Sequence, residues 1–393
     1  MLLRMQKLSL PMSMMNNSEN LQNLPKDCIV PFAKQAGLTS FSSLYTIKHA
    51  LKTKKVGHTG TLDSFAEGLL VVCCGALTRL AGKITECDKT YQAVIQFGAE
   101  TDTLEYTGDI VKTAPLPTKE NVERAVTHFT GEIMQVPPAF SAIHVDGKRA
   151  SDAVRSGKAV SIPARKVTVY SSKILDVNFA AGDANGLRLV DSALVEFSVS
   201  KGTYIRSLAR DIGDFASSAA HLTGLFRTKI GEFKIEEAAG FELLEPFTIA
   251  RVQKTVTDYL DAKKRADSVA DSKYLKNSKN SKELSSPEKL RGFENEAFLQ
   301  SEVLKKSLPM TQSLAKQCGF SVLHLVQGRE EWFSNGGKLS SSLFDVSPFS
   351  LKTEFAAVFT ASEQFAGLLQ KNERGCFTYC FVCHCFTAQK GAN

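Results

Sequence analysis

A Lys- and Ser-rich segment most constrains the fold, because it divides the 393-residue chain into two parts that are rich in apolar residues. The segment 261–296 contains few aromatic residues and includes the run KNSKNSKELSS. Such a composition cannot bury enough apolar surface to offset the conformational entropy that folding removes. We therefore interpret 261–296 as a flexible, low-complexity insertion between a large N-terminal part and a smaller C-terminal part.

The large N-terminal part, from residue 27 to about 250, mixes strand and helix patterns. Alternating or β-branched runs predict strands, and helical spacing between a Thr cap and a terminal Gly predicts a helix. Strands are predicted at 91–98, 166–179 and 193–200, and helices at 118–131 and 204–216. Because strands and helices alternate irregularly, we predict an α+β domain with a mixed sheet rather than regular βαβ winding.

The two ends of the chain differ from this domain. Residues 1–26 lack a continuous apolar segment followed by a small-residue cleavage site, so we expect a flexible extension rather than a signal peptide. Short apolar runs at 321–326, 355–361 and 375–386 predict a small β-rich module over 301–388.

The charge and the cysteine content indicate which partners and which cellular compartment the protein suits. The net charge of +7 is compatible with an anionic partner such as RNA, although many enzymes are equally basic. The chain has no run of 18 apolar residues, so we expect no membrane-spanning helix. Nine cysteines, an odd number, without a secretory signal indicate a reducing compartment, and we predict a cytoplasmic protein.

The stretch VGHTGTLDSFAEGLL, residues 56–70, holds the carboxylate of Asp63 in a short Gly/Thr loop. Glycines permit a tight backbone, and the apolar run that follows would anchor the loop to the core. Such a loop can hold an acid rigidly at the edge of a cleft. Taken alone, the same letters are equally compatible with a plain turn whose Asp caps the backbone.

The sequence gives little sign of chemistry that depends on a nucleotide cofactor, a serine nucleophile or a metal ion. No Walker loop, dinucleotide-binding fingerprint or GxSxG motif is present, so no nucleotide cofactor is predicted. The cysteines at 376–385 lie in an alternating strand pattern without a second ligand pair, which favours buried or idle thiols over a zinc site. Tyr91 and Tyr204 stand beside Lys and Arg, which suits base stacking, although such tyrosines are more often core residues.

Five blocks in order resemble the bacterial TruB-type tRNA pseudouridine synthases. They are GHTGTLDSFAEGLLVVCCG (57–75), CDKTYQAVIQFGAETDTLEYTGDI (87–110), QVPPAFSAIHVDGKRASDAVRSG (135–157), SKGTYIRSLARDIG (200–213) and AAHLTGLFRTKIGEF (219–233). Five ordered blocks are far more specific than any one of them. The resemblance implies a pseudouridine synthase fold, with a mixed, largely antiparallel central sheet flanked by helices. The C-terminal module is loosely similar to the small RNA-binding domain of the family.

The resemblance also implies an activity: isomerisation of the T-loop uridine of tRNA, at tRNA position 55, to pseudouridine without cofactor or metal. The essential acid of the family corresponds to Asp63, as nucleophile or as the group that steers the detached base. Arg206 would keep that carboxylate ionised. Tyr91 would stack on the flipped uracil, and its hydroxyl would assist proton transfer. Tyr204 and Leu225 would line the pocket.

His58 would fill the gap that the flipped base leaves in the T-loop; the plainer interpretation is a loop histidine bonded to nearby backbone. Basic residues at 52–55 (KTKK) and at Arg79, Lys89, Lys201 and Arg227 would contact phosphates. Two departures stand out: Ser64 replaces a usual Pro, and Glu67 adds a negative charge where Thr or Ser is common.

Two other functions share this scaffold. A non-catalytic tRNA-binding or folding chaperone would not need Asp63, Arg206 and Tyr91 together, and all three are present. A pseudouridine synthase acting on another RNA would keep the chemistry and change the substrate. We expect the T-arm of tRNA as the partner, no obligatory protein partner, no membrane association and a monomer.

Overall fold

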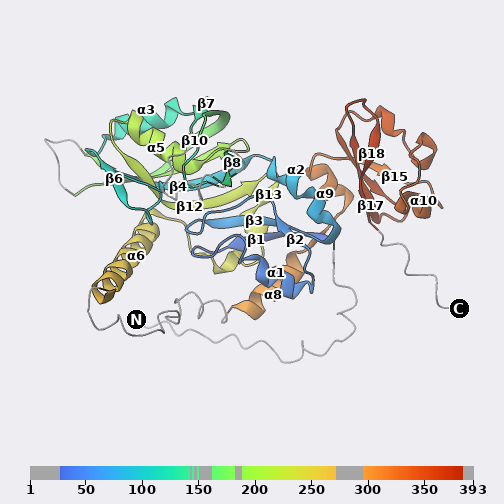
Figure 1. Cartoon of the computed structure of the whole chain (residues 1–393), viewed down its shortest axis with the longest axis horizontal. Coiled ribbons are helices and arrows are strands. Elements are labelled where there is room, and N and C mark those ends of the chain that lie inside the picture. The colour runs from blue at the N-terminus through green and yellow to red at the C-terminus, as the bar shows by residue number, and fades with distance from the viewer. Residues whose placement is uncertain are drawn as a thin grey trace.

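The computed structural model describes residues 27–141, 144–145, 148–149, 162–181, 188–270 and 295–383. These residues form one large sheet flanked by helices and a smaller sheet near the C-terminus (Figure 1). The N-terminal extension predicted over 1–26 and most of the predicted insertion, 271–294, lie outside the described residues.

The large sheet is mixed and largely antiparallel, as predicted. Its strands, in spatial order, are β14 (Leu308–Pro309), β1 (Cys28–Lys34), β3 (Glu67–Cys74), β12 (Ala220–Ile230), β4 (Lys89–Phe97), β11 (Val190–Val199), β10 (Arg165–Phe179) and β7 (Gly131–Gln135). β2 (Val56–His58) pairs with β3, and β13 (Phe233–Lys234) pairs with β12. Along this order only the β3–β12 pair is parallel.

The strands at 91–98, 166–179 and 193–200 are confirmed as β4, β10 and β11. β1 and β3 are buried at every position because both faces of this part of the sheet are covered, and their sequences are apolar apart from Lys34 at the end of β1 and Glu67 at the start of β3. Two small ribbons accompany the sheet: β5 (Ala99–Thr101) with β6 (Ile110–Thr113), and β8 (His144–Val145) with β9 (Lys148–Arg149).

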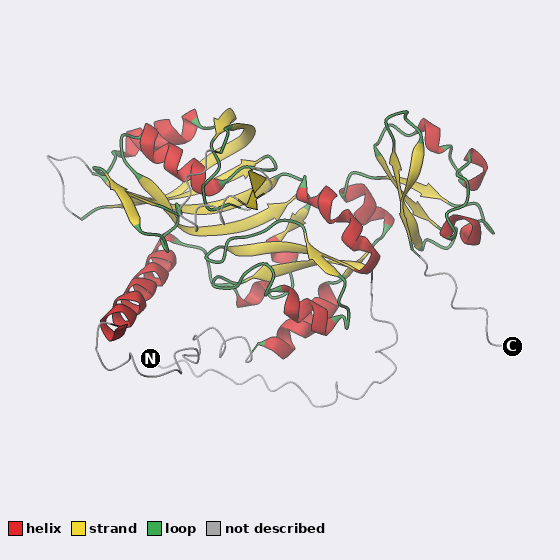
Figure 2. Cartoon of the chain, viewed as in Figure 1, coloured by secondary structure: helices red, strands yellow, loops and turns green. Residues whose placement is uncertain are grey.

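The two predicted helices are confirmed as α3 (Lys119–His128) and α5 (Ile205–Phe215). The Thr118 side chain accepts a hydrogen bond from the Asn121 amide at 3.3 Å, which satisfies one free amide of the first turn of α3. The described residues of the large body also include the helices α1 (Leu44–Ala50), α2 (Ala81–Thr85) and α6 (Ile249–Ala270). Figure 2 shows these helices around the strands.

Helices α1 and α5 cover the same face of the large sheet. α1 packs on Leu70 and Val72 of β3, and α5 packs on the core around Ala93 of β4. Residues in register on neighbouring strands share a face, and residues two apart on one strand share it too. Gly68 is in register with Arg227, and Arg227 with Tyr91, so one face continues from under α1 to under α5.

Part of the predicted insertion is ordered. Residues 261–270 extend α6, so the expectation of a flexible segment is wrong for them. The low aromatic content hid this helix because its first turns are held by Ile249 and Val252, which are buried against the sheet and precede the polar stretch.

After the insertion the chain returns to the large sheet before it forms the module. Helix α8 (Glu296–Lys306) packs beside α1, and β14 pairs with the edge of β1. The Thr46 hydroxyl of α1 donates to Glu296 of α8 at 2.9 Å. The boundary expected at residue 301 therefore falls inside α8, and the second sheet begins only at Ser321.

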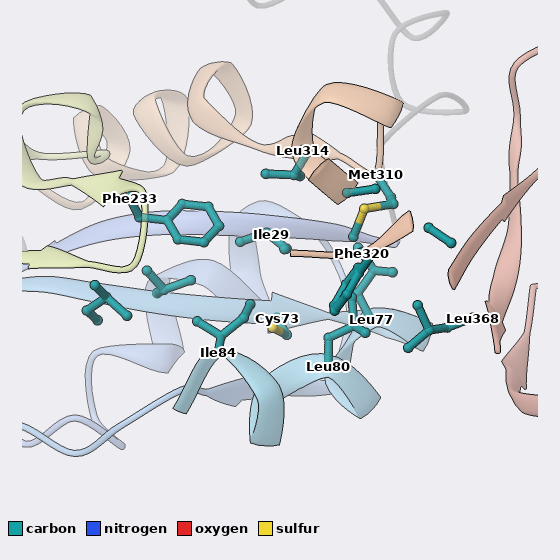
Figure 3. Close-up of a cluster of buried hydrophobic side chains, with 14 of the residues drawn as sticks. Ile29, Cys73, Leu77, Leu80, Ile84, Phe233, Met310, Leu314, Phe320 and Leu368 are labelled. Atoms are coloured by element: carbon teal, nitrogen blue, oxygen red, sulfur yellow. The ribbon is translucent and has the colours of Figure 1, made fainter. Parts of the chain in front are cut away.

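The β-rich C-terminal module is a four-stranded sheet, as predicted. Its order is β15 (Ser321–His324), β16 (Phe355–Phe359), β17 (Phe365–Lys371) and β18 (Phe377–Val382), with α9 (Gln312–Gln317) before it and α10 (Glu330–Ser334) within it. One apolar cluster joins the module to the large sheet (Figure 3). It runs from Ile29 and Cys73, past Leu77 and Leu80, to Phe320 and Leu368. No described helix is long and apolar enough to cross a membrane.

The continuous cluster makes a stability prediction. Leu368→Ala removes a side chain that is 1% exposed at the joint, so we expect the free energy of unfolding to fall by about 2–5 kcal/mol. Leu260→Ala, at a helix position that is 42% exposed, is the matched control and should cost about 0.5 kcal/mol or less. Denaturant unfolding measures both. Equal effects of the two substitutions would show that the joint is loosely packed.

Candidate functional site

The Asp63 loop, residues 59–66, is held to the sheet and to the segment that precedes α1. The Thr59 amide donates to Val71 of β3 at 3.0 Å, and the Gly37 amide donates to the Ser64 carbonyl at 2.8 Å. The Ser40 hydroxyl donates to the Leu62 carbonyl at 3.0 Å and accepts from the Leu62 amide at 2.8 Å. These bonds fix the backbone on both sides of Asp63.

Asp63 forms an ion pair with Arg206, from the first turn of α5. The Arg206 Nη2 donates to Asp63 Oδ1 at 3.2 Å, while Nε lies 3.0 Å from Oδ2 but off the hydrogen-bond axis. The arginine side chain is 7% exposed and the aspartate side chain 34% exposed, so the carboxylate faces open space and the cation does not. Arg206 also donates to the carbonyls of Thr103 and Phe140, both at 3.0 Å. These contacts fix the guanidinium before any ligand arrives.

The start of α5 is set by Gln135, which is fully buried at the end of β7. Its side-chain amide bonds the backbone of Tyr204 twice: Oε1 accepts from the amide at 2.8 Å and Nε2 donates to the carbonyl at 3.1 Å. The Ser207 hydroxyl donates to the Val136 carbonyl at 2.8 Å. Gln135 was not predicted as a site residue, because a lone glutamine ending a strand gives no local signal.

A cavity of about 520 Å³ opens beside the ion pair. Five of the six predicted site residues line it: Asp63, Tyr91, Tyr204, Arg206 and Leu225. His58 does not. The cavity combines aromatic and apolar walls with a partly exposed carboxylate and several cations, so it suits a flat, polar ring attached to an anionic chain.

The tyrosines on the two sides of the cavity each meet an arginine. The Arg165 guanidinium lies 4.9 Å from the centre of the Tyr204 ring, and the Arg227 guanidinium lies 6.0 Å from the centre of the Tyr91 ring. Arg165 also donates to the Gly202 carbonyl. Arg165 was not predicted as a site residue, since it follows a segment without a recognisable pattern.

Arg227 is not placed to contact a phosphate, contrary to the expectation from its charge. It is 1% exposed, its Nε donates to the Leu69 carbonyl at 2.8 Å, and its Nη2 donates to the Gly60 carbonyl at 3.1 Å. Gly68 makes this arrangement possible, because a Cβ there would lie 2.4 Å from the Arg227 carbonyl oxygen. Arg227 therefore supports the floor of the cavity and the Asp63 loop.

Two other expected phosphate contacts are also engaged within the protein. Lys89 lines the cavity, but its ammonium donates to the Thr85 and Cys87 carbonyls, and burial lowers its pKa to about 8. Lys201 is exposed and lies 3.1 Å from Glu86.

Lys34 lies buried beneath the Asp63 loop and was not predicted. Its ammonium donates to the Ala66 carbonyl at 2.5 Å and reaches the Ser64 carbonyl at 3.4 Å. Burial lowers the pKa of Lys34 to about 7, and the nearby carboxylates of Asp63 and Glu67 oppose that shift. The sequence feature that could have revealed this site is a lysine at the end of the buried run CIVPFA, because a buried charge must have hydrogen-bond partners.

Glu67 does not add free negative charge to the site, contrary to the expectation. Its side chain is 7% exposed, points to the opposite face from Arg227 and is paired with both terminal guanidinium nitrogens of Arg251 in α6. The partner lies 184 residues away, so no local pattern could reveal it.

His58 lies on β2, in register with Val72. Burial and the neighbouring charge of Arg227 lower its pKa, and its Nδ1 is buried without a hydrogen-bond partner among the described residues. The plainer interpretation of a histidine bonded to nearby backbone is therefore not supported at that nitrogen.

No group of three His, Cys, Asp or Glu side chains in the described ranges is close enough to hold a metal ion. In the cysteine-rich strand, Cys376 is exposed and Cys383 is buried, while His384 and Cys385 lie outside those ranges.

Known proteins resemble the chain in both sequence and structure. The family model of the TruB family pseudouridylate synthase (N terminal domain) matches residues 48–205. A curated tRNA pseudouridine synthase B from Treponema denticola is 42% identical over 330 residues, which cover 82% of this chain and 86% of the relative. That of Treponema pallidum (strain Nichols) is 44% identical over 235 residues, 56% of this chain and 64% of the relative. The solved structure of a Cbf5-Nop10-Gar1 complex aligns with a TM-score of 0.54 at 20% identity, over 92% of this chain and 85% of that chain, and supports the fold.

The low pKa of Lys34 predicts a pH-dependent stability. The unfolded chain holds this proton up to about pH 10.5 and the folded chain only to about pH 7, so stability is lost as the pH falls through that window. We expect Lys34→Met to gain stability relative to the wild type as the pH is lowered across it. Denaturant unfolding of both proteins at several pH values measures the difference. A difference that does not change with pH would contradict the buried, weakly basic lysine.

The Glu67–Arg251 pair predicts strong coupling. Arg251→Met leaves a buried carboxylate unpaired and should lower the free energy of unfolding by about 3–5 kcal/mol. Glu67→Thr combined with Arg251→Met removes both charges and should recover most of that loss. Unfolding of the two single variants and the double variant gives the coupling energy. Effects that add to within about 0.5 kcal/mol would mean that the two side chains act independently.

Proposed function

Because this chain belongs to the TruB family of tRNA pseudouridine synthases, we propose that it isomerises the T-loop uridine at tRNA position 55, with Asp63 as the reacting carboxylate. The chain is a tRNA pseudouridine synthase, an isomerase. The observation that carries the proposal is the Asp63–Arg206 ion pair at the wall of a cavity lined by Tyr91, Tyr204 and Leu225.

The target uridine must leave its stack to reach Asp63, because the carboxylate lies at the wall of a cavity and not on a flat surface. Tyr91 offers an aromatic face for the flipped uracil, and Leu225, which is 6% exposed, offers an apolar wall. Stacking and pocket contacts offset the few kcal/mol that flipping costs. The basic character of the site attracts the phosphates on either side of the base.

The reaction breaks the N-glycosidic bond, rotates the uracil and forms a carbon–carbon bond from C5 of the base to C1′ of the ribose. The proton that leaves C5 is taken up by the N1 position that the bond vacated, so no atom is gained or lost. Asp63 either attacks as a nucleophile or stabilises the positive charge on the sugar and steers the detached base.

Both roles require a carboxylate that is fixed in place, and the ion pair with Arg206 fixes Asp63. The guanidinium is held by Thr103, Phe140 and Asp63 together, so the pair needs no reorganisation when the base enters. Tyr91 lines the same cavity, and its hydroxyl is our candidate for proton transfer during the rearrangement. We further infer that the enzyme works in the cytoplasm on the T-arm, without a protein partner.

Substitution of the carboxylate tests the proposal. Asp63→Asn keeps the side-chain volume but removes the charge, so we expect pseudouridine formation to fall below detection while tRNA affinity stays within a few-fold. Unmodified tRNA transcript is incubated without added cofactor, and pseudouridine is mapped by carbodiimide labelling and primer-extension stops.

Asp214→Asn is the matched control, because Asp214 lies near the end of the helix that carries Arg206 and pairs with the exposed Lys112. It should keep full activity. Substantial turnover by Asp63→Asn would refute the role of Asp63. Binding without turnover by the wild type would favour a tRNA-binding chaperone, and a stop at another uridine would change the substrate position.

A further inference from the structure

Helix α1 presents an exposed stripe of aromatic and basic side chains that the proposed chemistry does not use. Tyr45, Lys48 and His49 lie on α1, Phe41 lies in the turn before the helix and Lys52 in the turn after it, and we call these five residues the α1 stripe. The opposite side of the helix carries Leu44 and Ile47, which are buried in the core. The stripe is therefore the outer surface of a helix whose inner surface already accounts for its stability.

The two aromatic side chains are unusually open for rings. Phe41 is 72% exposed and Tyr45 is 59% exposed. Each is accompanied by a basic side chain: the Lys48 ammonium lies 5.0 Å from the centre of the Phe41 ring, and the His49 ring centre lies 4.1 Å from that of Tyr45. Exposed rings offer flat faces for stacking, and Lys48 beside Phe41 adds positive charge for an anion.

The sequence on either side of the stripe carries charge of one sign. The sequence contains no Asp or Glu between Asp27 and Asp63, and Lys54 and Lys55 extend the charge of Lys48 and Lys52. None of these four lysines forms an ion pair within the described part of the chain, whereas Lys83, Lys112 and Lys201 all do. Unpaired, clustered cations favour a polyanionic partner.

The stripe begins beside the cavity, on the same face of the sheet. α1 packs on the β3 residues that share a face with Arg227 and Tyr91. Ser40, which precedes the stripe, exchanges two hydrogen bonds with Leu62, a residue that lines the cavity. An RNA whose uridine enters the cavity therefore passes close to Phe41.

We propose that the α1 stripe is a second RNA-contact surface, on which unpaired bases of the substrate stack while the lysines meet the neighbouring phosphates. This proposal rests on the proposed function for the identity of the RNA. A partner protein is a poorer fit, because two separate rings among cations do not form the apolar centre that protein interfaces require. A duplex is also a poorer fit, because its bases are already stacked.

Either of two parts of a tRNA could supply the bases. They are unpaired nucleotides of the T-loop beside the target, or unpaired nucleotides elsewhere in the tRNA. The chemistry of recognition is the same for both, and the choice of substrate separates them.

The test uses the full chain with Phe41→Ser and Tyr45→Ser combined. We expect KM for tRNA to rise about tenfold, which corresponds to roughly one base that no longer stacks, with kcat unchanged because no reacting atom is touched. Phe215→Ser, an aromatic residue that is 42% exposed at the far end of α5, is the matched control and should leave KM unchanged. Thermal unfolding of each variant verifies that it is folded.

The substrates are full-length tRNA and the isolated T-arm hairpin. A weaker interaction with both assigns the stacking to the T-loop, and a weaker interaction with full-length tRNA alone assigns it to another part of the molecule. An unchanged KM on both, or a change equal to that of Phe215→Ser, would overturn the proposal.

A second variant tests the lysines independently of the rings. Lys48→Gln, Lys52→Gln and Lys54→Gln together should reduce the slope of log Kd against log salt by about 0.7 for each phosphate that a lysine no longer neutralises. An unchanged slope would refute the phosphate contacts. Direct binding measurements also keep this proposal separate from the proposed function. If the wild type binds tRNA through the stripe but shows no turnover, the proposed function is refuted and the RNA-contact surface is retained.

Discussion

The ion pair between Asp63 and Arg206 is the interaction on which the rest of the site depends. It joins a loop at one edge of the large sheet to a helix whose arginine lies 143 residues later in the chain. Each partner is fixed by other contacts: the loop by Ser40 and Gly37, and α5 by Gln135. A buried charged pair is favourable only when hydrogen bonds offset the desolvation of both charges, and the carbonyls of Thr103 and Phe140 accept from the two terminal nitrogens of the guanidinium.

The same rule explains why so many cations surround one reacting acid. Arg227 and Lys34 are buried next to the Asp63 loop, and their donors end on the carbonyls of Leu69, Gly60 and Ala66. Backbone carbonyls satisfy Arg227 without neutralising its charge, whereas burial lowers the pKa of Lys34 to about 7, so that Lys34 is charged only part of the time at neutral pH. Arg206 and Arg227 place the loop in a positive field that attracts the anionic chain of an RNA.

Much of the fold followed from local pattern: the strands β4, β10 and β11, the helices α3 and α5, the mixed sheet and the β-rich module were all predicted. The resemblance to the family, and not local pattern, named five of the residues that line the cavity. What could not be predicted depends on partners distant in sequence. Glu67 is neutralised by Arg251, and the return of α8 to α1 places residues 296–306 with the large sheet. Residues 261–270 are helical because the first turns of α6 are packed against the sheet. The composition of the polar stretch alone contains no sign of that packing.

The charge of a basic residue alone also did not predict whether its side chain is available to a ligand, because availability depends on burial. Arg227 lies near the Asp63 loop in space, and Lys52 lies near it in sequence. Arg227 is 1% exposed and donates to carbonyls, whereas the Lys52 side chain is exposed. A buried cation costs several kcal/mol of desolvation, so it is kept only where its geometry is fully used. An exposed lysine costs almost nothing and remains available to a ligand. Internal cations therefore build the site, and the exposed lysines that follow α1 are available for the RNA contacts that we propose.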